Sequence, residues 1–117
     1  MPRSGQLPQG NEATDLFGAL ANPQRLRVIA ALAQGARYVS QLARDLEISR
    51  PLLQVHLKKL TAAGLVVSRI EVSDDGKAMR FYELTSFMFE ITPTSLAAAA
   101  RTLHPEPPAA STRKALP

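Results

Sequence analysis

The chain of 117 residues contains no cysteine and no tryptophan, and aromatic residues make up only 5% of it. Without cysteine the protein can form no disulfide, no thiolate metal site and no thiol nucleophile. The low aromatic content predicts a core built mainly from Ala, Leu and Val. The length is that of a single domain with a modest hydrophobic core.

Long apolar segments are also missing from the sequence. No apolar run approaches the roughly 20 residues that a membrane-spanning helix needs, and the opening segment MPRSGQLPQGNEATD lacks the apolar stretch of a signal peptide. We therefore expect a soluble domain in the cytoplasm. The sequence also lacks a glycine-rich phosphate loop, an HExxH motif and a Ser/His/Asp or paired-carboxylate arrangement, so we expect no enzymatic activity.

The charge balance is basic, with a formal net charge of +4 and an isoelectric point of about 10.0. Such a bias is compatible with a polyanionic partner such as nucleic acid, although many basic proteins bind none. The prediction of function therefore depends on the motifs rather than on the charge.

Proline and glycine gather at the two ends of the chain. This composition predicts disordered tails over residues 1–11 and 105–117. The folded domain is expected between them, over residues 12–104.

Two helices are predicted at the start of this domain. Apolar residues recur at helical spacing from Glu12 to Leu20. Asn22 and Pro23 then end the first helix and begin the second, which we expect over residues 24–33 before Gly35.

A short helix, a tight turn and a longer helix follow. Ser40 is the expected cap of the short helix, over residues 41–46. The longer helix lies in the stretch SRPLLQVHLKKLTAAG, where Ser49 can accept a hydrogen bond from a first-turn amide. Pro51 is tolerated there because its missing N–H has no helical partner, and Gly64 can adopt the left-handed conformation that closes the helix. We therefore predict a helix-turn-helix over residues 40–64.

The longer helix has one apolar face, because Leu53, Leu57 and Leu60 follow the i, i+4, i+7 pattern. A β-hairpin is predicted directly after it: LVVSRIE is rich in β-branched residues, Ser73-Asp74-Asp75-Gly76 is a turn signal, and KAMRFYEL returns as the second strand. A helix-turn-helix with a wing over residues 65–85 is a winged helix, mainly α with one hairpin. In this fold the second helix enters the major groove of DNA.

Three segments resemble the ArsR/SmtB-type winged helix-turn-helix regulators. They are LANPQRLRVIAAL, SQLARDLEISRPLLQVHLKKLTAAGLV and DDGKAMRFYELT, which are similar to the second helix, the helix-turn-helix and the wing of that family. The resemblance implies a homodimer formed by the terminal helices, with recognition helices about one DNA turn apart. It also implies repression that an effector relieves.

The sequence departs from this family in three respects. Because cysteine is absent, thiolate sensing of arsenic, cadmium or lead is excluded. Leu52 and Gln54 replace small hydroxyl residues that are common in the family, so the DNA sequence read must differ. The apolar, strand-like segment over residues 86–91 precedes the last helix, whereas metal-sensing members usually continue from the wing directly into a long helix.

The base-reading candidates on the longer helix are Arg50, Gln54 and Lys58. Arginine pairs with guanine O6 and N7, glutamine with adenine N6 and N7, and lysine with guanine or phosphate. Leu52 and Val55 are candidates for contact with thymine methyl groups. The alternative is an ordinary solvated helix face.

Other polar side chains on the helix-turn-helix and the wing are candidates for contact with the DNA backbone. They are Arg44, Ser49, Lys59, Arg69, Lys77 and Arg80. Asp74 and Asp75 at the wing tip would repel phosphate, which argues against deep insertion of the wing into the minor groove. Arg25 and Arg27 do not share a helix face, and we expect one of them to be structural or to contact the backbone.

The last helix is predicted over residues 93–104, with Thr92 as its cap and Pro93 at its first position. Its use is dimerisation with the first helix, and packing within one chain is the alternative. The candidate interface residues are Leu16, Phe17, Leu20, Leu96, Ala100 and Leu103.

The chain has only two histidines. We interpret His56 as packed or phosphate-contacting. His104 and Glu106, with Glu12 or Asp15 across a dimer, are candidate ligands for Zn²⁺ or Ni²⁺. A frayed helix end is the alternative for His104.

The sequence as a whole predicts a sequence-specific, double-stranded DNA-binding transcriptional regulator. The alternative is a winged helix used as a protein-interaction module or as a co-regulator that needs a partner protein. If the protein is a regulator without a sensory site of its own, control through a partner protein is expected, and the apolar segment Phe87, Met88 and Phe89 is where that partner is expected to bind.

Overall fold

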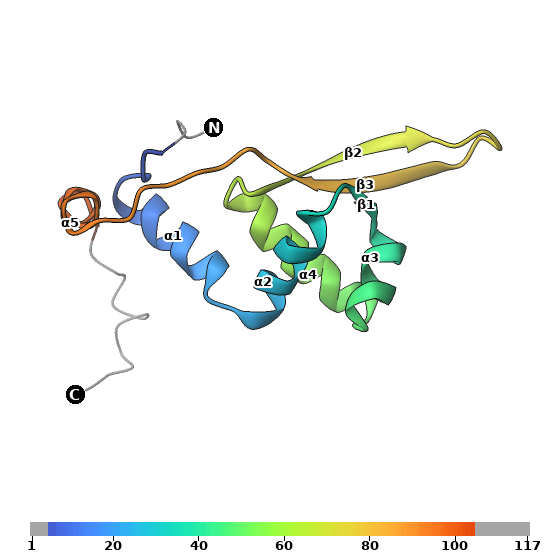
Figure 1. The fold of residues 1–117 in the computed structure, drawn as a ribbon, viewed down its shortest axis with the longest axis horizontal. Helices are drawn as coiled ribbons and strands as arrows, with labels where there is room; N and C mark the ends of the chain where they lie inside the picture. Colours follow the sequence, from blue (N-terminus) through green and yellow to red (C-terminus); the bar gives the residue numbers. More distant parts are fainter. Residues whose placement is uncertain (1–4, 105–117) are drawn as a thin grey trace.

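The computed structural model describes residues 5–104, which form helices packed against a small antiparallel sheet (Figure 1). In chain order the elements are α1 (Gly10–Leu20), α2 (Pro23–Leu32), β1 (Arg37–Tyr38), α3 (Val39–Leu46), α4 (Arg50–Ala62), β2 (Val66–Val72), β3 (Ala78–Leu84) and α5 (Pro93–Ala100). The helix-turn-helix (α3 and α4) and the wing (β2 and β3) follow one another along the chain, as predicted for a winged helix.

Local capping explains where three of the helices begin. The side chains of Asn22 and Ser49 accept hydrogen bonds from the amides of Arg25 and Leu52, at 3.1 and 3.3 Å. Thr92 caps α5, and the Ser95 hydroxyl returns a bond to the Thr92 amide. Each of these helices also has a proline in its first two positions, where a missing N–H leaves no helical bond unmade.

The expected Ser40 cap of α3 is wrong. The helix already begins at Val39, and Tyr38 occupies the N-cap position without a side-chain bond to the first turn. The reason is the short strand β1, which pairs Arg37 with Tyr82 of β3 and leads the extended backbone straight into the helix. The sequence prediction contained no strand at this point.

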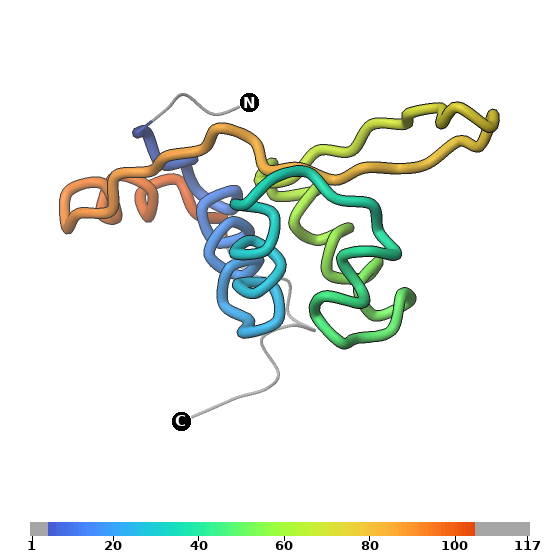
Figure 2. The backbone as a smooth tube through the Cα atoms, turned by 45° about the vertical axis from the view of Figure 1, so that its right-hand side comes forward, coloured from blue at the N-terminus to red at the C-terminus, as the bar shows by residue number. Residues whose placement is uncertain are grey.

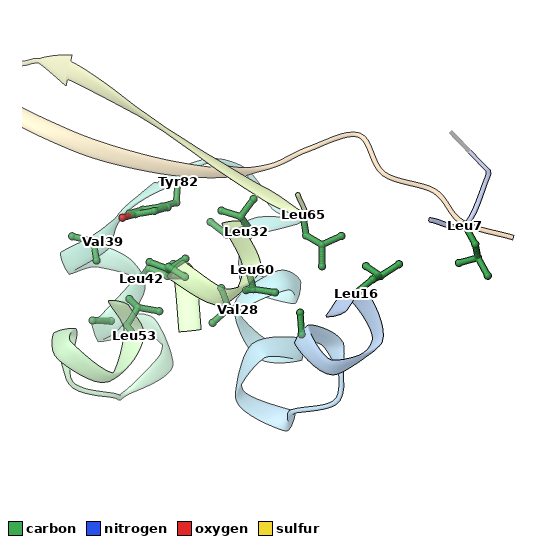
Figure 3. Close-up of a cluster of buried hydrophobic side chains, with 14 residues drawn as sticks. Leu7, Leu16, Val28, Leu32, Val39, Leu42, Leu53, Leu60, Leu65 and Tyr82 are labelled. Atoms are coloured by element: carbon green, nitrogen blue, oxygen red, sulfur yellow. The ribbon is translucent and has the colours of Figure 1, made fainter. Parts of the chain in front are cut away.

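The main core lies between the helices and the sheet (Figure 3). Leu53, Leu57 and Leu60 of α4 are buried, which confirms the predicted apolar face of this helix. Burying one such leucine stabilises the fold by about 1.5–3 kcal/mol. Other members of the core come from α2, α3 and the sheet: Val28, Leu32, Val39, Leu42, Ala43, Leu65, Val66 and Tyr82.

The wing is a two-stranded ribbon that projects beyond the helices (Figures 1 and 2). Its strands pair in antiparallel register from Val66 with Leu84 to Val72 with Ala78. Because side chains alternate between the faces of a strand, Tyr82 and its partner Ser68 lie on the face turned toward α4. Arg69 and Phe81 lie on the opposite face.

The N-terminal arm, residues 5–9, is ordered against the C-terminal half of the chain, so the prediction of a disordered tail over residues 1–11 is wrong for residues 5–11. Leu7 is only 5% exposed and belongs to the core cluster. The backbone of Gly5 exchanges hydrogen bonds with the backbone of Met88 and Glu90. Burial of the apolar Leu7 side chain accounts for this order. Residues 1–4, and the tail predicted over 105–117, lie outside the described residues.

The segment after the wing also differs from expectation. Residues 86–91 form only a single bridge, between Phe89 and Gly5, instead of a strand. The last helix ends at Ala100 rather than at residue 104. The chain continues to His104, whose amide donates to the Asn11 side chain at 3.0 Å.

Candidate nucleic-acid interface

The outward side of α4 carries the three predicted base-reading residues. Arg50, Gln54 and Lys58 are all exposed, and their spacing of four residues places them in one row along the helix. Leu52 and Val55 are exposed on another part of the same surface. The helix therefore presents cationic, amide and apolar groups side by side, which are the groups that read base edges.

A hollow lies between α4, the start of α3 and the base of the wing. Among residues 5–104, the residues lining it include no carboxylate, so the charged groups that face it are all positive. The uncapped N-terminus of α3 adds the partial positive charge of its free amides. The lining residues are Tyr38, Val39, Ser40, Arg50, Gln54, Lys77, Ala78, Met79 and Arg80. We call this the α4–wing hollow.

The two arginines of the wing that were predicted to contact the DNA backbone lie on opposite faces of the wing. Arg80 lines the α4–wing hollow and donates to the Ser68 hydroxyl at 3.0 Å. Arg69 lies on the opposite face of the wing, where Glu71 and Glu83 pair with its guanidinium and Phe81 lies beneath it. A contact of Arg69 with the DNA backbone stays a prediction, and the contact would have to be made from the face of the wing opposite the one turned toward α4.

The other candidates for contact with the DNA backbone lie on or near α4 but do not form one cluster. Arg44, near the end of α3, and Lys59 on α4 are exposed. Ser49 is exposed as well, but its oxygen already accepts the cap bond from the Leu52 amide. Its hydroxyl hydrogen remains a donor that a phosphate could accept.

A residue of the wing that sequence analysis missed forms a hydrogen bond with Gln54. The Tyr82 hydroxyl of β3 donates to Gln54 Oε1 at 3.3 Å. Tyr82 is buried and its bond to Gln54 is part-buried, and a tyrosine hydroxyl in such a position usually has a hydrogen-bond partner. Alternation along the strand could have placed Tyr82 on the same face as Arg80, but no sequence pattern indicated its contact with α4.

His56 is packed inside the protein, which agrees with one of the two readings of this residue. Its imidazole is buried, and Nδ1 lies 3.2 Å from Arg25 Nη1. Burial, followed by the positive charge of Arg25, lowers the pKa of His56 from its ordinary value of 6.5. Arg25 also donates to the Ala19 carbonyl at 2.7 Å. Arg25 is therefore the structural member of the Arg25 and Arg27 pair.

The wing tip remains acidic. Hydrogen bonds from the Ser73 hydroxyl and then from the Lys77 amide lower the pKa of Asp75. These bonds close the turn between β2 and β3. Asp74 is exposed beside it.

The candidate metal ligands do not form a site in the described structure. His104 is exposed beyond the end of α5, and Glu106 lies outside the described residues. Within residues 5–104, no group of three or more His, Asp or Glu side chains could hold a metal ion.

The candidate dimer residues fall into two groups. Leu16 is only 2% exposed and belongs to the core of its own chain, so the prediction that it contacts a second copy is contradicted. Phe17 and Leu20 are partly buried against that core. By contrast, Leu96 and Leu103 are 41% and 46% exposed. Ala100 is also exposed.

Comparison with known proteins agrees with this architecture. The sequence profile described as "Bacterial regulatory protein, arsR family" matches residues 22–68. An uncharacterised HTH-type transcriptional regulator of Methanocaldococcus jannaschii is 38% identical over 73 residues, which cover 62% of this chain and 76% of that protein.

Two solved structures share the fold. HlyU from Vibrio cholerae superimposes with a TM-score of 0.56 at 34% identity, over 65% of this chain and 77% of that one. The homodimeric winged helix-turn-helix DNA-binding domain of a possible ArsR-family regulator from Mycobacterium bovis gives a TM-score of 0.57 at 28% identity. That match covers 63% of this chain and 64% of the other.

Among residues 5–104, no helix has the length and apolar character needed to cross a membrane. The residues matched by the profile include α2, the helix-turn-helix and the start of the wing. The chain therefore belongs to the arsR family of bacterial regulatory proteins, which are winged helix-turn-helix transcriptional regulators.

Proposed function

We propose that this protein binds double-stranded DNA as a homodimer and regulates transcription, with α4 in the major groove. One observation carries the proposal: the exposed row of Arg50, Gln54 and Lys58 borders a hollow whose charged groups are all positive. In winged helices, the second helix of the helix-turn-helix enters the major groove while the wing lies beside it. The role is regulatory rather than catalytic, and its place is the cytoplasm.

The charged residues divide into two roles in this arrangement. Arg50 and Lys58 read base edges from α4 together with Gln54. Lys77 and Arg80 hold a DNA phosphate in the α4–wing hollow, where no lining carboxylate opposes it. Further backbone contacts come from the exposed side chains around α4: Arg44, Ser49 and Lys59.

The second copy packs on α5. Leu96, Ala100 and Leu103 leave an apolar strip exposed on one chain, and burying such a strip favours association. The partly buried Phe17 and Leu20 of α1 are close enough to the surface to extend it. The relative from Mycobacterium bovis is described as homodimeric, which supports the same state here. An effector or a partner protein would release the dimer from DNA.

Fluorescence anisotropy of the purified full chain tests this function. The probes are the DNA upstream of the protein's own gene and a random duplex of equal length, each at two salt concentrations. We expect tighter binding to the upstream DNA, and affinities that fall as salt rises because phosphate contacts release counterions.

Two variants separate the proposed roles. Lys77→Gln should weaken binding to both duplexes to a similar extent, whereas Arg50→Gln should mainly reduce the preference for the upstream DNA. Arg27→Gln is the control, since Arg27 is exposed on α2 and does not line the α4–wing hollow. Failure of the folded protein to bind either duplex would contradict DNA binding and favour a protein-interaction module.

A further inference from the structure

We propose that Tyr82 is a positioning residue that determines which base Gln54 reads. The inference rests on the proposed function, because it concerns the same face of α4. It assigns to a buried tyrosine of the wing a part in sequence recognition, although the tyrosine itself need not touch DNA.

The contact between Tyr82 and Gln54 joins β3 of the wing to α4, and both elements belong to the proposed DNA interface. Tyr82 is 8% exposed, and its ring belongs to the core (Figure 3). Its hydroxyl donates to Gln54 Oε1 at 3.3 Å. Rotation of the Gln54 side chain away from the wing would leave this part-buried hydroxyl without its acceptor, which is costly inside a protein.

The neighbouring hollows show that Gln54 stands at the junction of helix and wing. It lines the α4–wing hollow together with Arg50 and Arg80. It also lines a second hollow together with Lys58 and Tyr82. The side chain is exposed, so one end of its amide can face DNA while the other end faces the wing.

This orientation changes the chemistry of the glutamine. Free glutamine pairs with adenine through two bonds, because its NH₂ donates to N7 and its oxygen accepts from N6. With Oε1 turned toward Tyr82, Gln54 presents its NH₂ group to the groove. Guanine offers the acceptors N7 and O6 to such a donor, whereas the N6 amino group of adenine is a second donor that opposes it. Gln54 therefore reads guanine in preference to adenine, contrary to the pairing expected from sequence.

Selection of bound sequences from a random duplex library tests the assignment with three full-length proteins: wild type, Tyr82→Phe and Gln54→Ala. We expect the wild type to select guanine at one position of each half-site, and Gln54→Ala to lose selection at that position only. Tyr82→Phe keeps the ring but removes the hydroxyl, so the same position should shift toward adenine. Anisotropy with duplexes that differ at this base pair should show the guanine-to-adenine affinity ratio falling about tenfold.

Tyr38→Phe is the matched control. Tyr38 stacks on Phe81 of the same sheet and lines the α4–wing hollow, but its hydroxyl has no bond to Gln54. Its removal should leave the base preference unchanged. NMR without DNA gives a second readout. The side-chain amide resonances of Gln54 are assigned by their absence from the spectrum of Gln54→Ala. They should shift in Tyr82→Phe and keep their positions in Tyr38→Phe.

The outcomes separate this inference from the function on which it rests. If the wild type selects a sequence and Tyr82→Phe selects the same base at the Gln54 position, the role of Tyr82 is refuted and DNA binding stands. Unmoved Gln54 amide resonances in Tyr82→Phe would refute it equally. If the folded wild type binds no duplex, the proposed function fails and this inference fails with it.

Discussion

The guanidinium of Arg25 bridges the end of α1 and the buried side of α4, with Nη1 3.2 Å from His56 Nδ1 and Nε bonded to the Ala19 carbonyl at 2.7 Å. One side chain of α2 thus ties together the helix proposed to support the dimer and the helix proposed to read DNA. The orientation of α4 depends on this bridge as well as on its leucines.

Replacing Arg25 with Met should therefore destabilise the protein, because His56 and Ala19 lose their hydrogen-bond donor while the aliphatic packing is kept. We expect a loss of about 1–3 kcal/mol in the free energy of unfolding, measured by urea denaturation. Arg27→Met on the exposed side of the same helix should change it by about 0.5 kcal/mol or less. Equal losses in the two variants would show that the bridge contributes nothing.

Acid should weaken the fold through His56. Its pKa is lowered in the folded state by burial and by Arg25, so the unfolded chain takes up a proton more readily. The stability that depends on neutral His56 is complete above the unfolded pKa of about 6.5 and is lost as the pH falls below it. His56→Gln keeps an acceptor for Arg25 but does not titrate.

Urea denaturation between pH 7.5 and 5 checks this dependence. The free energy of unfolding of the wild type should fall more steeply than that of His56→Gln, by at most about 1.4 kcal/mol per pH unit for one group. Parallel curves for the two proteins would mean that His56 is not the acid-sensitive group.

Two adjacent leucines on α4 should respond very differently to truncation. Leu53 is fully buried and Leu52 is 43% exposed. Leu53→Ala should cost about 2–5 kcal/mol of unfolding free energy, because a cavity remains in the core. Leu52→Ala should cost much less and should act on DNA affinity instead. A small effect of Leu53→Ala in urea denaturation would contradict the placement of this face.

Glycine is required at the start of α1. Gly10 has a φ of +56°, and a Cβ atom there would lie 2.6 Å from the Thr102 carbonyl oxygen. Gly10→Ala should therefore lower the free energy of unfolding by about 1–2 kcal/mol or more. Gly18→Ala, in open space on the same helix, should instead stabilise it by up to about 1 kcal/mol. Stabilisation of the protein by Gly10→Ala in thermal unfolding would refute this strained and closely packed position of Gly10.

A charge placed on α5 should dissociate the proposed dimer. Leu96→Glu introduces a carboxylate where the second copy is proposed to pack, and desolvating it opposes association. Sedimentation equilibrium should show the dimer dissociation constant rising at least tenfold, which corresponds to about 1.4 kcal/mol. Leu26→Glu is the control, at a more exposed leucine of α2. An unchanged dimer in Leu96→Glu would exclude α5 from the interface.

The parts of the fold that local chemistry determines were predictable. Ser49 and Thr92 cap the helices that they were expected to cap. Asn22 stands at the predicted junction of the first two helices, and the structure shows that it also caps the second. Gly64 follows α4 with a φ of +79°. Each signal depends on residues a few positions apart, which is why it can be recognised in the sequence.

Contacts between distant residues were not predictable. The bonds of Tyr82 with Gln54 and of Arg25 with His56 join residues 28 and 31 positions apart, and they exist only after the elements have packed. The position of Arg69 could not be predicted without knowing which face of the wing turns toward α4. Leu7 is an isolated apolar residue among prolines and polar residues, so no periodic pattern predicted its burial.

The contact between the first and the last described segments also affects the order in which the protein can fold during synthesis. Asn11 and His104, which bond to each other, are 93 positions apart in the chain. The helix-turn-helix and the wing run from α3 to β3 and precede α5 in the chain, so their contacts can form while the ribosome is still adding α5. The N-terminal arm and the start of α1 bond to segments on either side of α5, which are made later. The surface proposed to read DNA is thus completed before the surface proposed to pair two copies, which delays dimer assembly until synthesis has passed α5.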